Sequence, residues 1–409
     1  MIRSLTQNDL PLMHELQSRG LEVTQEQAET ASRVFGELFP KLYMDHPWAD
    51  ADARIQSLVA VGKDGRLAGL QAAMNRSFQF ENRILNAAIS TELYVAPDSR
   101  NSLHGIQLVK KFLSGPQDCS LCDVANDKTR QLWTRFGGEA LPVYGLTWMA
   151  VLSPTRFAAS LALKDSMTGR IVRPVTGLID RMAERFWKTE SSCDASQLRG
   201  EPLTPDRFAE LAPQFMTGRT LYPLYGEAGA RWIWNRLNFI TRGAGPSRQT
   251  LVYDRFDRPI GWHIYQWKPG QVARVSQLVA KPGSEDAVFA HLLKSLRQSG
   301  APGAIGRVQP EFLPTLSDAD CLFKRRSRYV LFHSPHESIR AAFRSGEAFL
   351  SMLDAEAVAQ LWNSPLEALA MFEASQRAEA SGQPIADSKS DCQVNSSDLN
   401  VPQERAVSQ

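Results

Sequence analysis

The chain has 409 residues, of which 43% are hydrophobic and 22% charged, as is usual for soluble globular proteins. Lysine and arginine total 46 and nearly balance 44 acidic residues, whereas a dedicated nucleic-acid-binding protein usually carries a basic excess. No segment approaches the run of about 20 apolar residues that spans a bilayer, and the first residues lack the apolar region of a secretory signal. We therefore expect a cytoplasmic protein of two or three domains, with no membrane span and no nucleic-acid partner.

The first 150 residues alternate strand and helix patterns in the order β-α-α-β-β-β-α-β-α-β. A short strand at 2–5 leads through capping residues into a helix, and a second helix is predicted over 25–39. Strand patterns at 57–61 and 67–73 flank a glycine-containing turn and predict a β-hairpin. The meander is expected to continue to Ala96, followed by a helix over 102–112, a strand over 119–125, a helix over 127–136 and a closing strand over 144–152.

Five cysteines in so long a chain do not form a disulfide framework. Cys119 and Cys122 make a C-x-x-C pair, but without a second pair a structural zinc site is short of ligands. They lie in a predicted strand, where alternation points them to opposite faces of a sheet. We therefore expect two small buried core residues rather than a metal or redox site.

The same order of elements recurs from about residue 202. A predicted hairpin over 251–265 places Gly261 where Gly69 stands in the first hairpin, and the strand before Pro282 matches the strand before Pro97. A helix over 287–298 and strands at 303–308 and 329–333 follow, the last of them closing the second unit. The chain is therefore interpreted as two copies of one α/β unit.

Five segments are predicted along the chain. The tail has no aromatic residue and is rich in Ser, Gln, Asp and Asn, so it buries too little apolar surface to offset its ordering entropy. The segments are a first unit at 1–152, a helical linker at 153–200, a second unit at 201–336, a helical extension at 337–374 and a disordered tail at 375–409.

The segment from Thr91 to Leu108 carries the most informative chemistry. A strand ends at Pro97, a polar loop follows, and a helix opens near Ser102. The first-turn amides of such a helix have no internal partners and form a natural anion site, to which a glycine at 105 would give close backbone access. The same arrangement is also a common structural connection.

This segment resembles motif A of the GCN5-related N-acetyltransferase superfamily, a strand with the signature Val-x-Pro-x-x-Arg that leads into a helix. Val95, Pro97 and Arg100 match that signature. The segment from Val124 to Gly138 resembles motif B, with Asn126 between a strand and a helix. The resemblance implies an α/β (α+β) fold of two tandem acyl-CoA N-acyltransferase-like units, each a mixed, mostly antiparallel sheet flanked by helices.

The resemblance also implies a co-substrate, acetyl-CoA or another acyl-CoA, whose pantetheine arm enters between splayed fourth and fifth strands. Glu92 would be the catalytic base for an attacking amine, and Tyr94 on the same strand face would be an acid. Glu92 could equally face solvent or pair with an arginine, and His104 could be an exposed first-turn histidine. The implied cofactor-binding residues are Val95, Arg100, Leu103, His104, Gly105, Ile106 and Asn126.

Three positions depart from the superfamily pattern. Leu103 replaces the first glycine of the phosphate loop, Trp133 stands where a tyrosine usually protonates the departing thiolate, and Gly138 replaces a phenylalanine. The second copy has no such loop after Pro282.

Three functions are therefore compatible with the sequence. The first is an N-acyltransferase whose small-molecule amine, amino sugar or peptide acceptor binds in a cleft between the copies. The alternatives are a non-catalytic binding or scaffold protein, favoured by Leu103 and Trp133, and a Fem-like aminoacyl-tRNA-dependent transferase. The near-neutral charge and the absence of coiled-coil heptads count against the Fem-like alternative.

Overall fold

The computed structural model describes most of the two predicted units, and the two sheets and their helices consist of these described residues. They are 1–19, 39–40, 43–48, 56–100, 102–162, 193–325 and 328–354. The predicted helix over 25–39 apart from Phe39, most of the predicted linker, the extension beyond Asp354 and the predicted tail lie outside the described residues.

The first sheet has eight strands in the order β1-β2-β3-β4-β5-β15-β6, with β9 paired to the end of β3. All of its pairs are antiparallel except β4 with β5. Its strands are β1 (Ile2–Ser4), β2 (Leu58–Val61), β3 (Leu67–Phe80), β4 (Arg83–Val95), β5 (Cys119–Ala125), β6 (Glu139–Ala140), β9 (Leu221–Pro223) and β15 (Tyr329–His333).

The second sheet has seven strands in the order β14-β7-β13-β12-β11-β10-β8. Again one pair, β12 with β13, is parallel and the others are antiparallel. Its strands are β7 (Leu146–Val151), β8 (Arg199–Pro202), β10 (Ser247–Tyr253), β11 (Pro259–Gln266), β12 (Ala273–Ala280), β13 (Gly303–Arg307) and β14 (Leu322–Arg325).

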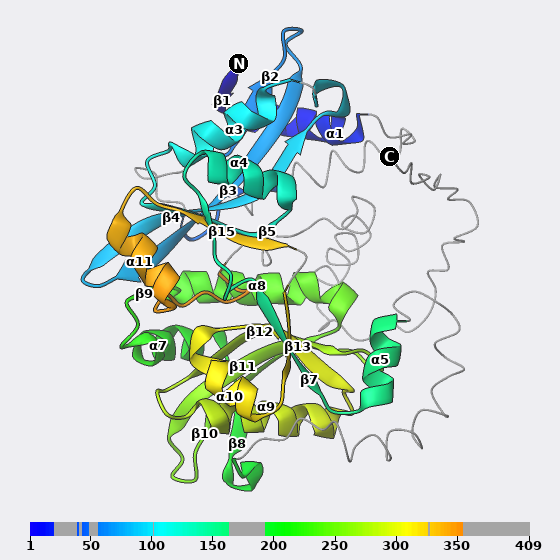
Figure 1. Ribbon diagram of the computed structural model, residues 1–409, viewed down its shortest axis with the longest axis vertical. Coiled ribbons are helices and arrows are strands. Elements are labelled where there is room, and N and C mark those ends of the chain that lie inside the picture. The colour runs from blue at the N-terminus through cyan, green and yellow to red at the C-terminus, as the bar shows by residue number, and fades with distance from the viewer. Residues whose placement is uncertain are drawn as a thin grey trace.

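Each sheet contains a strand from the other half of the sequence. In Figure 1, β15 lies beside β5 in the upper sheet and β7 lies beside β13 in the lower sheet. We expected β7 to close the first unit and β15 to close the second, and both placements are wrong. A hydrophobic strand pattern shows that a strand is buried but not which sheet buries it. The proposed boundaries therefore separate two stretches of sequence but not the two sheets, because β7 belongs to the second sheet and β15 to the first.

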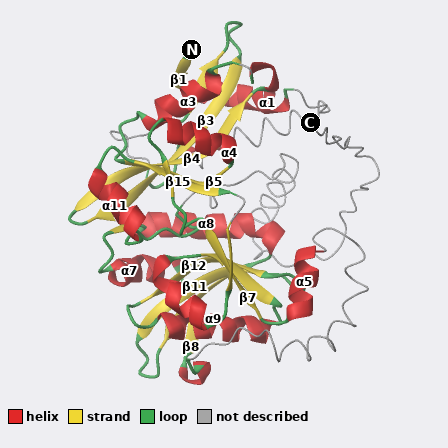
Figure 2. Ribbon diagram, in the orientation of Figure 1, coloured by secondary structure: helices red, strands yellow, loops and turns green. Residues whose placement is uncertain are grey.

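Helices cover both faces of each sheet (Figure 2), because each sheet carries apolar side chains on its two sides. On the first sheet, α1 (Leu10–Ser18) and α11 (Glu337–Ser345) pack on one face, and α3 (His104–Leu113) and α4 (Asp127–Arg135) on the other. On the second sheet, α7 (Pro205–Met216) and α8 (Gly226–Ala244) oppose α9 (Glu285–Ser299) and α10 (Leu313–Asp318), while α5 (Pro154–Ala162) follows β7. No helix in the described part of the chain is long and apolar enough to span a membrane.

The two cysteines of β5 lie where alternation predicts. Cys119 belongs to the core that α1 and α11 cover, and Cys122 to the core beneath α3 and α4. Both are buried, and burial raises the pKa of the Cys119 thiol well above its ordinary value. They therefore point to opposite faces of the sheet as small core side chains.

Strand register bears out the predicted equivalence of two glycines. Gly69 on β3 faces Val95 on β4, and Gly261 on β11 faces Ala280 on β12. A Cβ on Gly69 would lie 3.0 Å from the carbonyl oxygen of Tyr94, and a Cβ on Gly261 would lie 2.2 Å from that of Val279. Both strands thus need glycine at the same point, which is the strongest local sign of the internal repeat.

Candidate functional site

The two parallel strands of the first sheet diverge at the centre of the predicted site. β4 and β5 pair only where Ala87, Ala88 and Ile89 face Cys119, Ser120 and Leu121. From Ser90 to Val95 and from Cys122 to Ala125 no β4–β5 pair forms, although β4 stays paired with β3 and β5 with β15. The splay that the resemblance implied is present, and we call it the β4–β5 gap.

Backbone groups of β4 line this gap. The Ala96 N–H donates to the Ala68 carbonyl at 3.0 Å, on the β3 side. Since the N–H and C=O groups of successive strand residues point to opposite edges, those of Leu93 and Val95 point into the gap. Leu93 is therefore a candidate binding residue that sequence reasoning missed, because its contribution is the direction of its backbone and no side-chain signal records it.

A β-bulge on each strand flanks the gap. Thr91 and Glu92 together oppose Ala72, and Asp123 and Val124 together oppose Val330. A bulge ends regular pairing and re-aims the side chains that it carries, and bulges are frequent next to active sites. Asp123 is fully buried and was not among the predicted site residues.

Glu92 lies on β4 at the edge of the gap and is partly buried. Burial raises its pKa to about 7, and no charged or hydrogen-bonding neighbour among the described residues offsets that effect. Glu92 lies in the bulge two residues before Tyr94, and Tyr94 packs against the core under α1. A carboxylate with a pKa near neutrality is suited to accept a proton from an amine.

Burial also favours the protonated form of the Tyr94 hydroxyl. Burial raises its pKa above the ordinary value, and the positive charges of Arg100 and Arg19 oppose that rise. The phenol therefore stays protonated at neutral pH and can donate a proton. Asp98 beside it forms an ion pair with Arg19 at 3.5 Å.

The predicted phosphate loop leads from β4 into α3. It contains a short 3-10 turn at Pro97–Ser99, and the Ser102 hydroxyl lies 2.8 Å from His104 Nδ1 and accepts from its backbone N–H at 3.2 Å. The helix begins at His104, so its first-turn amides, including those of Gly105 and Ile106, have no intrahelical acceptors. A Cβ on Gly105 would lie 3.3 Å from Val95 Cγ2, so this glycine lets the helix start close to the end of β4.

The departures from the superfamily pattern have different structural consequences. Leu103 is 64% exposed at a φ of −81°, so leucine at this position neither strains the backbone nor packs into the loop. Trp133 is fully buried beside Phe112, with ring centroids 6.1 Å apart, so no acid can act from that position.

The Asn126 side chain caps α4, where it accepts from the Thr129 N–H at 2.9 Å. This residue is exposed at the end of β5. Among the described residues, no group of three His, Cys, Asp or Glu could hold a metal ion.

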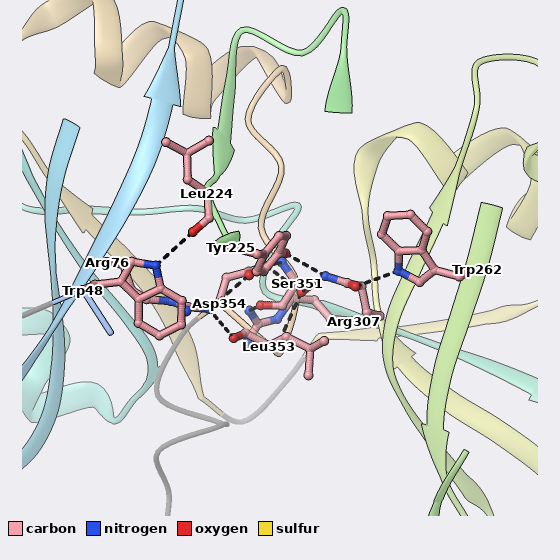
Figure 3. Close-up of polar contacts among 10 residues, drawn as sticks. Trp48, Arg76, Leu224, Tyr225, Trp262, Arg307, Ser351, Leu353 and Asp354 are labelled. Carbon is pink, nitrogen blue, oxygen red and sulfur yellow. Dashed lines mark hydrogen bonds and ion pairs between the residues drawn. The ribbon is translucent and has the colours of Figure 1, made fainter. Parts of the chain in front are cut away.

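A buried polar network joins the two units beside these elements (Figure 3). Asp123 from β5 forms an ion pair with Arg307 from β13. Arg307 Nη1 donates to the Ser351 carbonyl at 3.3 Å, as Figure 3 shows. Arg76 from β3 donates to the Leu353 carbonyl at 2.7 Å, and its guanidinium lies 3.8 Å from the Trp48 ring centre. At this point of the junction, the segment 351–354 contacts both arginines, while the acceptor cleft that we expected between the copies stays a prediction.

Comparison with known proteins identifies the fold. No family model matches the chain, and no curated protein matches it in sequence. A solved structure from Enterococcus faecalis V583, described as a conserved protein of unknown function and probable N-acyltransferase, matches with a TM-score of 0.50 and 11% identity. The match covers 82% of this chain and 72% of that one.

Two GCN5-related N-acetyltransferases, from Anabaena variabilis ATCC 29413 and Kribbella flavida, match with TM-scores of 0.49 and 0.48 and 14% identity each. The Anabaena match covers 81% of this chain and 72% of that one, and the Kribbella match covers 82% and 70%. The chain shares the fold of the Enterococcus faecalis structure, whose description names a probable N-acyltransferase. The predicted fold class, with its two helix-flanked sheets, is thereby confirmed. In this fold the β4–β5 gap, the α3 N-terminus and Glu92 lie at one end of the first sheet.

Proposed function

We propose that the protein is an acyl-CoA-dependent N-acyltransferase, with acetyl-CoA as the simplest donor. The observation that carries this proposal is a partly buried carboxylate, Glu92, with a pKa of about 7 at the edge of the β4–β5 gap. The acceptor would be an amine, carried by a small molecule, an amino sugar or a peptide.

The gap and the helix start offer complementary contacts to such a donor. Pantetheine is an extended chain with two amide groups, which can pair with the inward N–H and C=O of Leu93 as an added strand does. Its diphosphate would lie at the N-terminus of α3, near the Gly105 and Ile106 amides and the Arg100 side chain. Asn126, exposed beyond the end of β5, would contact the same ligand from the opposite strand.

The reaction needs one base, one acid and a donor to the developing oxyanion. Glu92 takes a proton from the acceptor amine, whose nitrogen attacks the thioester carbonyl carbon and forms the C–N bond. The Val95 N–H, which points into the gap, stabilises the carbonyl oxygen as it gains charge. The C–S bond then breaks, and the CoA thiolate takes its proton from Tyr94.

A second candidate function is a non-catalytic binding protein that keeps this fold. The observation in its favour is Trp133, which is fully buried where the superfamily places its usual acid. This candidate, a binding or scaffold protein, predicts no acyl transfer to any amine, whether or not the protein binds CoA.

Calorimetric titration with acetyl-CoA tests the donor site. We expect wild-type protein to bind, and Arg100→Glu to weaken the affinity at least about tenfold, because charge reversal repels the diphosphate. Lys63→Glu reverses a charge on the exposed β2–β3 turn and is the matched control. No binding at millimolar acetyl-CoA would refute the proposal, and binding without thiol release across a panel of amines would favour the second candidate.

A further inference from the structure

The second unit has its own splayed strands, placed by the same register as the first. β12 and β13 pair only from Ala273 to Val275, and β12 continues to Ala280 without β13. Gly261 faces Ala280 on β12, as Gly69 faces Val95 on β4, so Ala280 and Val95 are equivalent positions. Leu278 and Leu93 each lie two residues before these positions and are therefore equivalent too. Both strands also carry a bulge at the equivalent point, after Val275 and after Ser90.

In the second unit this gap is already occupied by a side chain. The carboxamide of Gln309 accepts from the Leu278 N–H at 3.0 Å and donates to the Leu278 carbonyl at 2.6 Å. Gln309 is 4% exposed and Leu278 is 1% exposed. One amide group thus satisfies both backbone groups of the residue that, in the first unit, remains available to an amide of pantetheine.

The residue of the second unit at the position equivalent to Glu92 is Gln277, and its carboxamide is hydrogen-bonded to other side chains of the protein. Gln277 Oε1 accepts from Trp262 Nε1 at 2.8 Å. Its Nε2 donates to the Tyr225 hydroxyl at 2.9 Å and to Ser351 Oγ at 3.0 Å. A carboxamide with all these contacts made cannot act as a base.

The helix that follows β12 carries its own negative charges where a phosphate would bind. α9 starts at Glu285, and its first turn contains Glu285 and Asp286. Asp286 accepts from the Thr315 hydroxyl at 2.6 Å. The first turn of α3 contains no acidic residue. Carboxylates at a helix N-terminus take the favourable interaction with its amides and repel a further anion.

We infer that the second unit is closed to acyl-CoA by its own side chains, with Gln309 as the internal substitute for a pantetheine amide. Gln309 is then the residue that determines which of the two gaps is open, and each chain binds a single acyl-CoA. The inference on stoichiometry rests on the proposed function, whereas the inference on Gln309 concerns the second unit alone.

Stoichiometry tests the first part. Titration of the full chain with acetyl-CoA should give one site per chain. Two equivalent sites would overturn this inference and leave the proposed function standing. No site at all would overturn the proposed function. The role of Gln309 would then be decided by the rate of hydrogen exchange of the Leu278 amide.

Amide hydrogen exchange without ligand tests that role. In wild-type protein the Leu278 amide should be protected, and Gln309→Met, which keeps the volume and removes both hydrogen bonds, should speed its exchange at least about tenfold. Gln298→Met, at an exposed position of α9, is the control. Protection of Ala304 verifies the fold of each variant.

If Gln309→Met does not fold, Gln309→Leu replaces it, since leucine likewise makes neither hydrogen bond to Leu278. This variant should also speed the exchange of the Leu278 amide. Exchange at Leu278 that stays at the wild-type rate in a folded variant overturns the assignment of Gln309.

Discussion

At the scale of single residues, Glu92 carries the chemistry of the proposal. The spacing of Glu92 and Tyr94 predicts one strand face for both, and the structure places Tyr94 in the core under α1 and Glu92 in a bulge of β4. The pKa of Glu92 could not be predicted from the sequence, because it follows from burial at a bulge without a partner. By contrast, Gln277 at the equivalent position of the second unit forms hydrogen bonds through both its Oε1 and its Nε2.

Replacing Glu92 with glutamine should remove the base while leaving the fold intact. We expect acyl transfer to fall by a factor of about 10² to 10⁴, the usual contribution of general base catalysis. The wild-type kcat/KM should rise with pH through about 7, where Glu92 loses its proton, and the variant should lack that rise. Glu81→Gln, on the exposed turn between β3 and β4, is the control, and an unchanged rate and pH profile in Glu92→Gln would contradict this role.

The same substitution has a consequence for stability. The folded-state pKa of Glu92 is raised, so the folded protein binds this proton more tightly than the unfolded chain. Its contribution to stability is therefore present at low pH and is lost as the pH rises from the ordinary value of a carboxyl through about 7. Because glutamine does not ionise, Glu92→Gln should have the larger free energy of unfolding above pH 7.

At the scale of elements, much of the fold could be predicted because local patterns determine it. The hairpins, the strand with opposed cysteines and the equivalence of Gly69 and Gly261 all follow from alternation and turn residues. The direction of the Leu93 backbone groups could not be predicted, since the bulge after Ser90 depends on pairing with β3. The contact between Gln309 and Leu278 joins residues whose proximity only the folded sheet creates.

The start of α4 allows a cap to be separated from a ligand contact. Asn126→Ala should lower the free energy of unfolding by about 1 kcal/mol, because the Thr129 N–H loses its acceptor, and Asn126→Asp should retain the cap. Urea denaturation measures this difference. If Asn126 also contacts the co-substrate, both variants should weaken acetyl-CoA binding, although only Asn126→Ala is less stable. Equal stability of Asn126→Ala and wild type would contradict the capping role.

At the scale of the whole molecule, the two units are joined by exchanged strands and by the buried network around Asp123 and Arg307. Removing one partner of a buried ion pair typically costs about 3–5 kcal/mol, so this contact strongly couples the halves. The exchange was not predictable, because β7 and β15 have the apolar pattern of closing strands in either sheet. One molecule therefore presents two related gaps, of which the first is open and the second is filled.

The most direct test of this account is amide hydrogen exchange in the full-length protein with and without acetyl-CoA. Backbone groups of Leu93 point into the open gap, whereas those of the equivalent Leu278 already bond Gln309. We predict that acetyl-CoA slows exchange at Leu93 by at least about tenfold and leaves Leu278 unchanged. Binding of acetyl-CoA that leaves Leu93 unprotected, or that protects Leu278 equally, would contradict the assignment of the β4–β5 gap as the donor site.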